Sequence, residues 1–168
     1  MTQTNVVRGD WWTIALPDRW KAPETLDNGT IYLDSFDESK GIYVTTWMLG
    51  PEEASTGAAT AAESFKDKDA QALQDMEGFE WRQVDERSDR SEAGDAVVLV
   101  DHLAEASQYR IATKVIARPP VVVRAAFHDY LCDDYEASRE YFAPIIESLS
   151  LVAAGPDGET NAEPGDLG

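Results

Sequence analysis

The residues best suited to covalent chemistry lie close together in the last third of the chain, where His128 and Asp129 precede Cys132. A helix dipole can lower the pKa of a thiol at the start of a helix, and a nearby histidine can act as general base. Asp129 or Asp133 would then orient the imidazole. A strand end and a helix start need not bring these side chains together, so we interpret Cys132 as structural. A thiol-dependent hydrolase that uses Cys132 is kept as an alternative.

Three aspartates in the same stretch have the chemistry of a divalent-cation site: Asp129, Asp133 and Asp134. Aspartates at a helix start ordinarily accept hydrogen bonds from backbone N–H groups, and we favour that role. One cysteine and two histidines do not fit the spacing of a zinc site. The chain also lacks a P-loop, a dinucleotide-binding fingerprint and a nucleophile elbow. We therefore predict no bound metal, no cofactor and no enzymatic activity.

A stripe of basic residues is a candidate partner-binding site. Four potential cations make up this stripe: Arg110, Lys114, Arg124 and His128. Alternation along the predicted strands 109–117 and 121–130 places two of them on one face of each strand. If the turn between these strands brings Lys114 near Arg124, all four line one face of the sheet. They then form either a groove for an acidic or polar partner segment, or ordinary surface ion pairs with Asp101 and Glu105.

Two of the five tryptophans are also candidates. Trp11 and Trp12 are adjacent in the first predicted strand, so their side chains point to opposite faces. One of them should therefore leave the core side, and an exposed tryptophan is a common interface anchor. The alternative is that a helix or loop covers it. We include both residues among the candidate partner-binding residues.

The hydrophobic pattern divides the chain into nine elements in the order β-β-β-α-β-β-β-β-α. Strands are predicted at residues 11–16, 30–36, 42–49, 79–86, 96–103, 109–117 and 121–130. Apolar residues recur with near-helical spacing over 58–76, which is typical of an amphipathic helix. A second helix follows Asp133, which forms a capping-box pattern with Glu136. Pro144 is expected to kink or divide that helix.

The short polar turns between the strands predict antiparallel pairing. The first three strands are expected to form a meander, and strands 96–103, 109–117 and 121–130 are expected to be consecutive neighbours. We therefore predict an α+β fold, with an antiparallel sheet of about six to seven strands flanked by two main helices.

We expect a single domain over residues 8–152, preceded by a flexible segment at 1–7 and followed by a disordered acidic tail at 153–168. The tail has too few apolar side chains to offset its ordering entropy. The first residues lack the basic and apolar segments of a signal peptide. No apolar run approaches the ~20 residues of a membrane span. These features favour a cytoplasmic protein without membrane insertion.

The chain is strongly acidic, with 32 acidic and 14 basic residues and a formal net charge of -18. Nucleic acid is disfavoured as a partner, because its phosphates would be repelled. The charge accounts for solubility in the simplest interpretation. Two further interpretations are a basic protein partner and a salt-rich cytoplasm, in which an acid-rich and lysine-poor surface stays hydrated. Composition does not separate these alternatives.

The stretch from Trp12 to Trp20, which contains Leu16, Pro17 and Trp20, resembles the strand and "LPxxW" start of the PsbP-like superfamily. The order of the later strands and helices is similar to that superfamily over residues 8–152. Its members include photosystem extrinsic proteins, a Ran-binding import factor, DcrB-like proteins, mycobacterial-type lipoproteins and type VI effector chaperones. The resemblance implies a sheet of about six strands flanked by helices, and non-enzymatic protein binding.

The chain lacks the export signals of the secreted members, which favours a cytosolic effector chaperone, adaptor or immunity protein. A small-molecule or lipid carrier that uses the cleft between sheet and helix is a second possibility.

Overall fold

One large antiparallel sheet organises the chain. The structure, a computed structural model, describes residues 4–152. The strands of its seven-stranded sheet follow in this order: β3 (Glu24–Thr25), β4 (Ile31–Asp34), β5 (Lys40–Met48), β9 (Val121–Asp129), β8 (Tyr109–Arg118), β7 (Ala96–Ala104) and β6 (Arg82–Arg90). All neighbouring pairs are antiparallel. The predicted α+β class and the consecutive pairing of β7, β8 and β9 are therefore confirmed.

A smaller sheet has β2 (Trp12–Pro17) in the middle, between β1 (Thr4–Arg8) and β10 (Ser150–Leu151). The prediction that residues 11–16 join a meander with the next two strands is wrong, because β2 pairs with β1 and β10. The alternate side chains Trp12, Ile14 and Leu16 are buried in the main core. The apolar face of β2 therefore packs as a separate layer over the large sheet.

The N-terminal segment differs from the expectation where the structure describes it. Residues 4–7, expected to be flexible, lie in β1 and form a continuous antiparallel ladder with β2. Val7 packs against the main core. This pairing satisfies backbone groups along one edge of β2, which a flexible segment would leave without protein partners. The tail expected at 153–168 lies outside the described residues.

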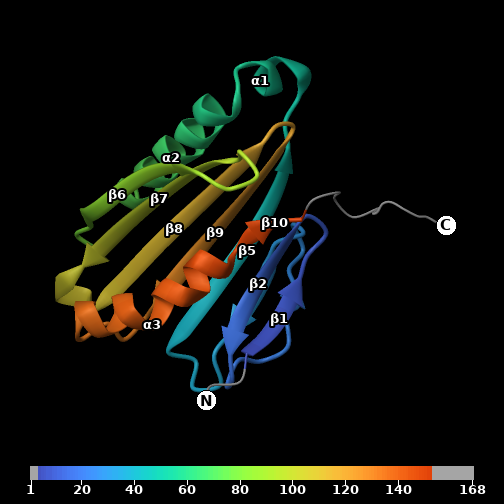
Figure 1. The fold of residues 1–168 in the computed structure, drawn as a ribbon. Helices are drawn as coiled ribbons and strands as arrows, with labels where there is room; N and C mark the ends of the chain where they lie inside the picture. The colour runs from blue at the N-terminus through green and yellow to red at the C-terminus, as the bar shows by residue number, and fades with distance from the viewer. Residues whose placement is uncertain (1–3, 153–168) are drawn as a thin grey trace.

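The two faces of the large sheet are covered by different elements (Figure 1). Helix α2 (Ala58–Gln74) follows the short α1 (Pro51–Ser55) and packs on β7 and β8. Helix α3 (Tyr135–Ser148) and the small sheet cover the opposite face, where α3 packs on β9 and β2. A 3₁₀ turn, η1 (Glu105–Ser107), links β7 to β8. Within residues 4–152, no helix is long and apolar enough to cross a membrane.

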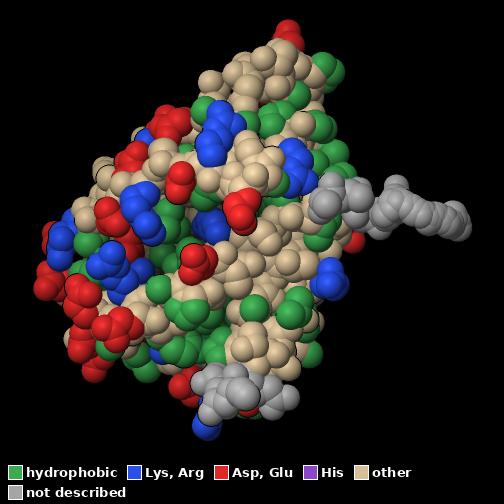
Figure 2. All heavy atoms as spheres, viewed as in Figure 1, with side chains coloured by type: hydrophobic (Ala, Val, Ile, Leu, Met, Phe, Trp, Pro, Cys, Tyr) green, Lys and Arg blue, Asp and Glu red, His purple; other side chains and the backbone are tan. Residues whose placement is uncertain are grey.

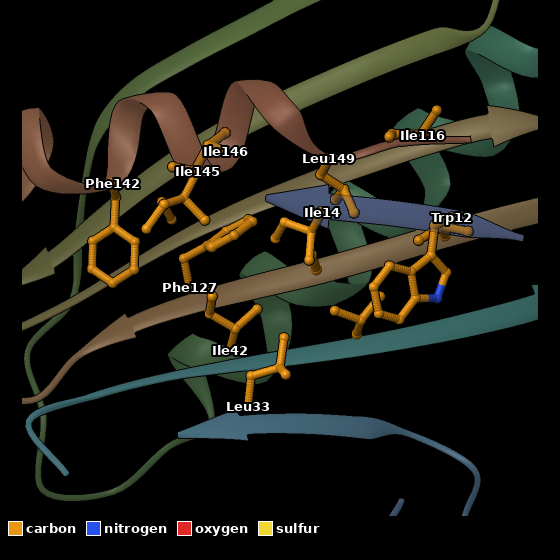
Figure 3. Close-up of a cluster of buried hydrophobic side chains, with 14 of the residues drawn as sticks. Trp12, Ile14, Leu33, Ile42, Ile116, Phe127, Phe142, Ile145, Ile146 and Leu149 are labelled. Atoms are coloured by element: carbon orange, nitrogen blue, oxygen red, sulfur yellow. The ribbon is translucent and has the colours of Figure 1, made fainter. Parts of the chain in front are cut away.

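The main core lies between the large sheet, α3 and β2 (Figure 3). Ile42 and Phe127 of the sheet meet Phe142 of α3 and Ile14 of β2, and all four side chains are buried. The rings of Phe127 and Phe142 pack edge to face with centroids 6.1 Å apart. This packing fixes how α3 sits on the sheet, and therefore which sides of α3 remain open.

Strand β6 departs most from its predicted bounds, since it spans Arg82–Arg90 instead of 79–86. Phe79 and Trp81 precede the strand and pack on the Tyr109 ring, with centroid distances of 5.4 and 4.9 Å. Nearly all of β6 is exposed, so its sequence has little apolar alternation to mark its ends. Its hydrogen bonds with β7 define it instead.

Helix α3 begins one residue later than predicted and is not divided. Asp134 Oδ1 accepts a hydrogen bond from the backbone N–H of Ala137 at 3.2 Å, so Asp134 is the cap and not Asp133. Pro144 lies inside the continuous helix on its exposed side. Because proline has no N–H group, the carbonyl of Glu140 loses its usual helical donor at a position that water reaches.

We predict that Pro144→Ala raises the free energy of unfolding by about 1–3 kcal/mol, because alanine restores the missing N–H group and removes the ring clash. Urea denaturation of both proteins measures this difference. Pro51→Ala is the matched control, since Pro51 occupies the first turn of α1, where proline is favourable. A Pro144→Ala variant no more stable than the wild type would contradict the prediction.

Candidate functional site

The predicted basic stripe is divided between the two faces of the sheet. The turn between β8 and β9 contains only two residues, so Arg118 pairs with Val121. In this register Lys114 lies opposite Ala125, and Arg124 lies opposite Val115. Directly opposed residues share a face, so the assumed pairing of Lys114 with Arg124 was one residue off, and a one-residue slip exchanges faces. The prediction of one continuous stripe is therefore wrong.

Arg110 and Lys114 lie on the α3 side, and Arg110 forms a buried ion pair. Its Nε and Nη2 donate to the two carboxylate oxygens of Asp101 at 2.9 and 2.8 Å. Its Nη1 donates to Ser138 Oγ of α3 at 3.1 Å, and Tyr135 Oη donates to Asp101 Oδ2 at 2.7 Å. Arg110 is 3% exposed, so these bonds replace its hydration and connect β7 and β8 to α3.

Lys114 stabilises the C-terminal end of α3. Its Nζ donates to the backbone carbonyls of Ile146 and Leu149, both at 2.8 Å. The last turn of α3 contains no basic residue of its own, so Lys114 supplies the cation from the sheet. Burial lowers the pKa of Lys114 to about 8.

Arg124 and His128 lie on the α2 side, and both are bonded within the chain. Arg124 Nε lies 2.6 Å from Asp69 Oδ1, which ties α2 to β9. His128 Nδ1 shares a hydrogen bond with Tyr109 Oη at 2.6 Å, and the rings of Tyr43 and Tyr130 pack around it. Burial, with a smaller contribution from the positive charge of Arg124, lowers the pKa of His128 to about 4.

The two tryptophans are not exposed anchors. Trp12 is buried in the main core, and Trp11 is half-buried against the same core. Trp11 directly precedes β2 and is partly covered by the main core, which is the alternative that the sequence left open.

The thiol and its supposed base lie on opposite sides of the sheet. His128 contacts the rings on the α2 side. Cys132 is buried, and burial raises the pKa of its thiol, with Asp129 adding to the rise. The cysteine–histidine arrangement therefore does not form. Asp129 Oδ1 instead accepts a hydrogen bond from the backbone N–H of Leu131. Across residues 4–152, no group of three or more His, Cys, Asp or Glu side chains is placed to hold a metal ion.

A groove of about 570 Å³ opens beside α3, over the part of the sheet that the helix does not cover. Its floor is apolar and consists of Val97 and Leu99 of β7 with Ala112 of β8. Arg110 and Lys114 lie at its base. Its walls carry charged residues: Asp85, Arg87 and Asp89 from β6, and Arg139 and Glu147 from α3. Figure 2 shows acidic and basic side chains intermingled around the hollow on this face.

The two residues at the base of the groove were predicted from the sequence as part of the basic stripe, whereas the residues of its walls were not. On β6, Asp85, Arg87 and Asp89 alternate with period two, which places them on one strand face. On α3, Arg139, Ala143 and Glu147 are spaced four apart and form one exposed stripe. These two spacings are visible in the sequence, although neither shows that the two elements face each other.

We predict that Arg110→Ala lowers the free energy of unfolding by about 3–5 kcal/mol, because it leaves the Asp101 carboxylate buried without its cation. The buried pair replaces the surface ion pairs that the sequence suggested as one alternative. Chemical denaturation measures the loss. The double variant Arg110→Met with Asp101→Leu is the control, since it removes both charges and should recover part of the stability. A loss below 1 kcal/mol for Arg110→Ala would contradict this account.

We predict that stability falls as pH drops from 6.5 towards 4, in part because His128 must take up a proton. Its pKa is about 4 in the folded protein and 6.5 ordinarily, so the unfolded state binds the extra proton first. The maximal contribution is ~3 kcal/mol. His128→Gln should flatten the dependence more than His102→Gln, whose histidine is shifted in the same direction by burial. Equal slopes for wild type and His128→Gln would contradict the prediction.

No protein-family model matches the chain, and no curated protein matches it. Among solved structures, the chain is similar to the solution structure of cyanobacterial PsbP (CyanoP) from Synechocystis sp. PCC 6803. The TM-score is 0.64 at 11% identity, and the match covers 90% of this chain and 92% of that chain. The chain also matches PA94 from Pseudomonas aeruginosa, a protein of unknown function, over 85% of this chain and 94% of that chain, at 14% identity and a TM-score of 0.42.

The second likeness is too distant to establish a shared fold. The first one extends over nearly the whole of both chains and, at 11% identity, concerns the fold alone. The chain therefore has a PsbP-like fold, as the resemblance of its Trp12–Trp20 stretch indicated.

Proposed function

We propose that this chain is a non-enzymatic, cytoplasmic protein-binding domain, and that it holds a segment of a partner protein in the groove between β6 and α3. The observation that carries the proposal is the apolar floor of Val97 and Leu99, which α3 leaves uncovered at the bottom of a charged groove. An effector chaperone, an adaptor and an immunity protein all fit this role.

The shape of the groove favours an extended segment. A strand forms one wall and a helix forms the other, so the floor is a strip that runs between them. Val97 and Leu99 lie two residues apart on β7, with their side chains on the same face. An extended chain also repeats every two residues, so it can place successive apolar side chains over this strip.

The charges favour a polypeptide over a nucleic acid. The lining contains four basic and four acidic residues, so the groove is locally balanced in a chain with a net charge of -18. A segment with mixed charges can enter without strong repulsion, and its own charges can pair with Arg87, Arg139 or the neighbouring carboxylates. Such exposed pairs contribute more to specificity than to affinity.

A small-molecule carrier is the second candidate, because a volume of about 570 Å³ lies within the ~300–1,000 Å³ range of ligand sites. The charged walls disfavour an acyl chain as the ligand. A polar or zwitterionic molecule fits this lining better than a lipid does.

We predict that filling the groove weakens partner binding at least tenfold without unfolding the chain. Ala143→Tyr adds a ring to the exposed, groove-facing side of α3. Ala137→Tyr adds the same ring to an exposed position of α3 that does not line the groove. Immobilised wild type and both variants are incubated with extract of the native host, and retained proteins are identified by mass spectrometry and tested as purified proteins by calorimetry. A partner should bind wild type and Ala137→Tyr with equal affinity and bind Ala143→Tyr at least tenfold more weakly.

Equal binding of that partner to Ala143→Tyr would overturn the groove as the binding site. If purified wild type retains no protein but releases a bound small molecule under denaturing conditions, the carrier replaces the protein-binding domain as the function.

A further inference from the structure

A second hollow, of about 430 Å³, lies at the end of the molecule where β2, β4 and β5 have their turns. Three segments form it: the turn at Pro17–Arg19, the turn from Ser35 to Lys40, and Tyr141 of α3. Tyr141 is two residues from Arg139 and does not line the groove. The two sites therefore use different sides of α3, and the second pocket is independent of the proposed function.

Two aromatic side chains that line this pocket are exposed. Phe36 is 60% exposed and Tyr141 is 37% exposed. Trp20 Nε1 donates to Tyr141 Oη at 2.9 Å, which holds the tyrosine in place. Exposed apolar side chains grouped around a hollow mark a site that contacts another molecule.

The pocket lining contains two cations, Arg19 and Lys40, and two carboxylates, Asp18 and Asp37. In residues 4–152, neither Arg19 nor Lys40 has a carboxylate oxygen within ion-pair distance, whereas Lys21 close by is paired with Asp34 and Glu38. Lys40 Nζ lies 5.1 Å from the centre of the Tyr141 ring. The Asp37 carboxylate accepts hydrogen bonds from Ser35 and Ser39, which lower its pKa to about 2.

The backbone at Arg19 is strained in a way that favours glycine. Its φ is +81°, in the left-handed region. A hydrogen bond of 2.8 Å from the Phe36 N–H to the Arg19 carbonyl and a bridge between Trp20 and Ser35 hold this conformation. Strained residues of this kind collect at ligand-binding sites, where the side chain has a use that glycine cannot supply. The turn belongs to the same Pro17–Trp20 stretch that carries the family resemblance.

We propose that this pocket binds the C-terminus of a partner polypeptide whose last side chain is apolar. The terminal carboxylate accepts hydrogen bonds from Arg19 and Lys40, and the apolar side chain packs between Phe36 and Tyr141. Arg19 and Lys40 can both donate to one added carboxylate, because Asp37 is already bonded to Ser35 and Ser39, while a longer acidic segment would be repelled by a chain of net charge -18. The exposed rim at Phe36 leaves room for the preceding residues to leave the pocket.

The test is an NMR titration of the ¹⁵N-labelled full chain with N-acetyl-Ala-Ala-Leu as the free acid and as the carboxamide. The acid should shift the amide signals of Arg19, Phe36 and Lys40, and the carboxamide should bind at least tenfold more weakly. Arg19→Gln should weaken binding of the acid at least tenfold. Arg8→Gln, which makes the same charge change on β1 outside the pocket lining, should leave binding unchanged.

Arg19→Gly keeps the test independent of folding, because glycine tolerates the positive φ and should preserve the melting temperature while losing the ligand. Equal binding of acid and carboxamide, or an Arg19→Gln variant that binds like wild type, would overturn the proposal. Tighter binding of free 3-phenylpropionate than of the tripeptide would assign the pocket to a small carboxylic acid instead. Ala143→Tyr should have no effect on this titration, so failure here and failure of the groove proposal are distinguishable.

Discussion

The register between β8 and β9 is the constraint on which the rest of the structure depends. The two-residue turn at 119–120 makes Arg118 pair with Val121, and this single choice sets the face of every side chain on the two central strands. Phe127 and Ala125 consequently face α3, and Val122 and Ala126 face α2. A register shifted by one residue would bury His128 and Arg124 in the main core. The apolar pattern of β8 and β9 therefore favours the observed register and disfavours registers shifted by one residue.

The same register assigns the central cations to the helices that they secure. Arg110 and Lys114 reach α3 through Ser138 and the last-turn carbonyls, and Arg124 reaches α2 through Asp69. In this strongly acidic chain, several of the few basic residues therefore bond the two long helices to the sheet. Each of these cations costs desolvation free energy, which its hydrogen-bonded partners offset. The surface retains the excess of carboxylates as a result.

Helix α3 then decides where other molecules can be bound. Its buried stripe, with Phe142 and Ile145, packs on the main core, and this contact leaves the two flanks of the helix free. One flank, with Arg139 and Glu147, faces β6 across the groove. The other flank presents Tyr141 to the turns at the end of the sheet. Both proposed binding sites therefore follow from the orientation of one helix on one sheet.

Local pattern was sufficient for the element order, the α+β class and most strand positions, because alternation and helical spacing are properties of neighbouring residues. It also singled out Arg110 and Lys114, which do lie at the base of the groove. It could not assign Arg124 and His128 to the correct face, because a shift of one residue in pairing leaves each strand pattern unchanged. Only tertiary packing decided that β2 lies in the small sheet and not in the large one. Its alternating apolar residues are compatible with an edge strand of the large sheet and with a separate layer. The bounds of the exposed strand β6 and the position of the groove beside it depend on strand pairing and on the orientation of α3. Both are set by contacts between residues far apart in the chain.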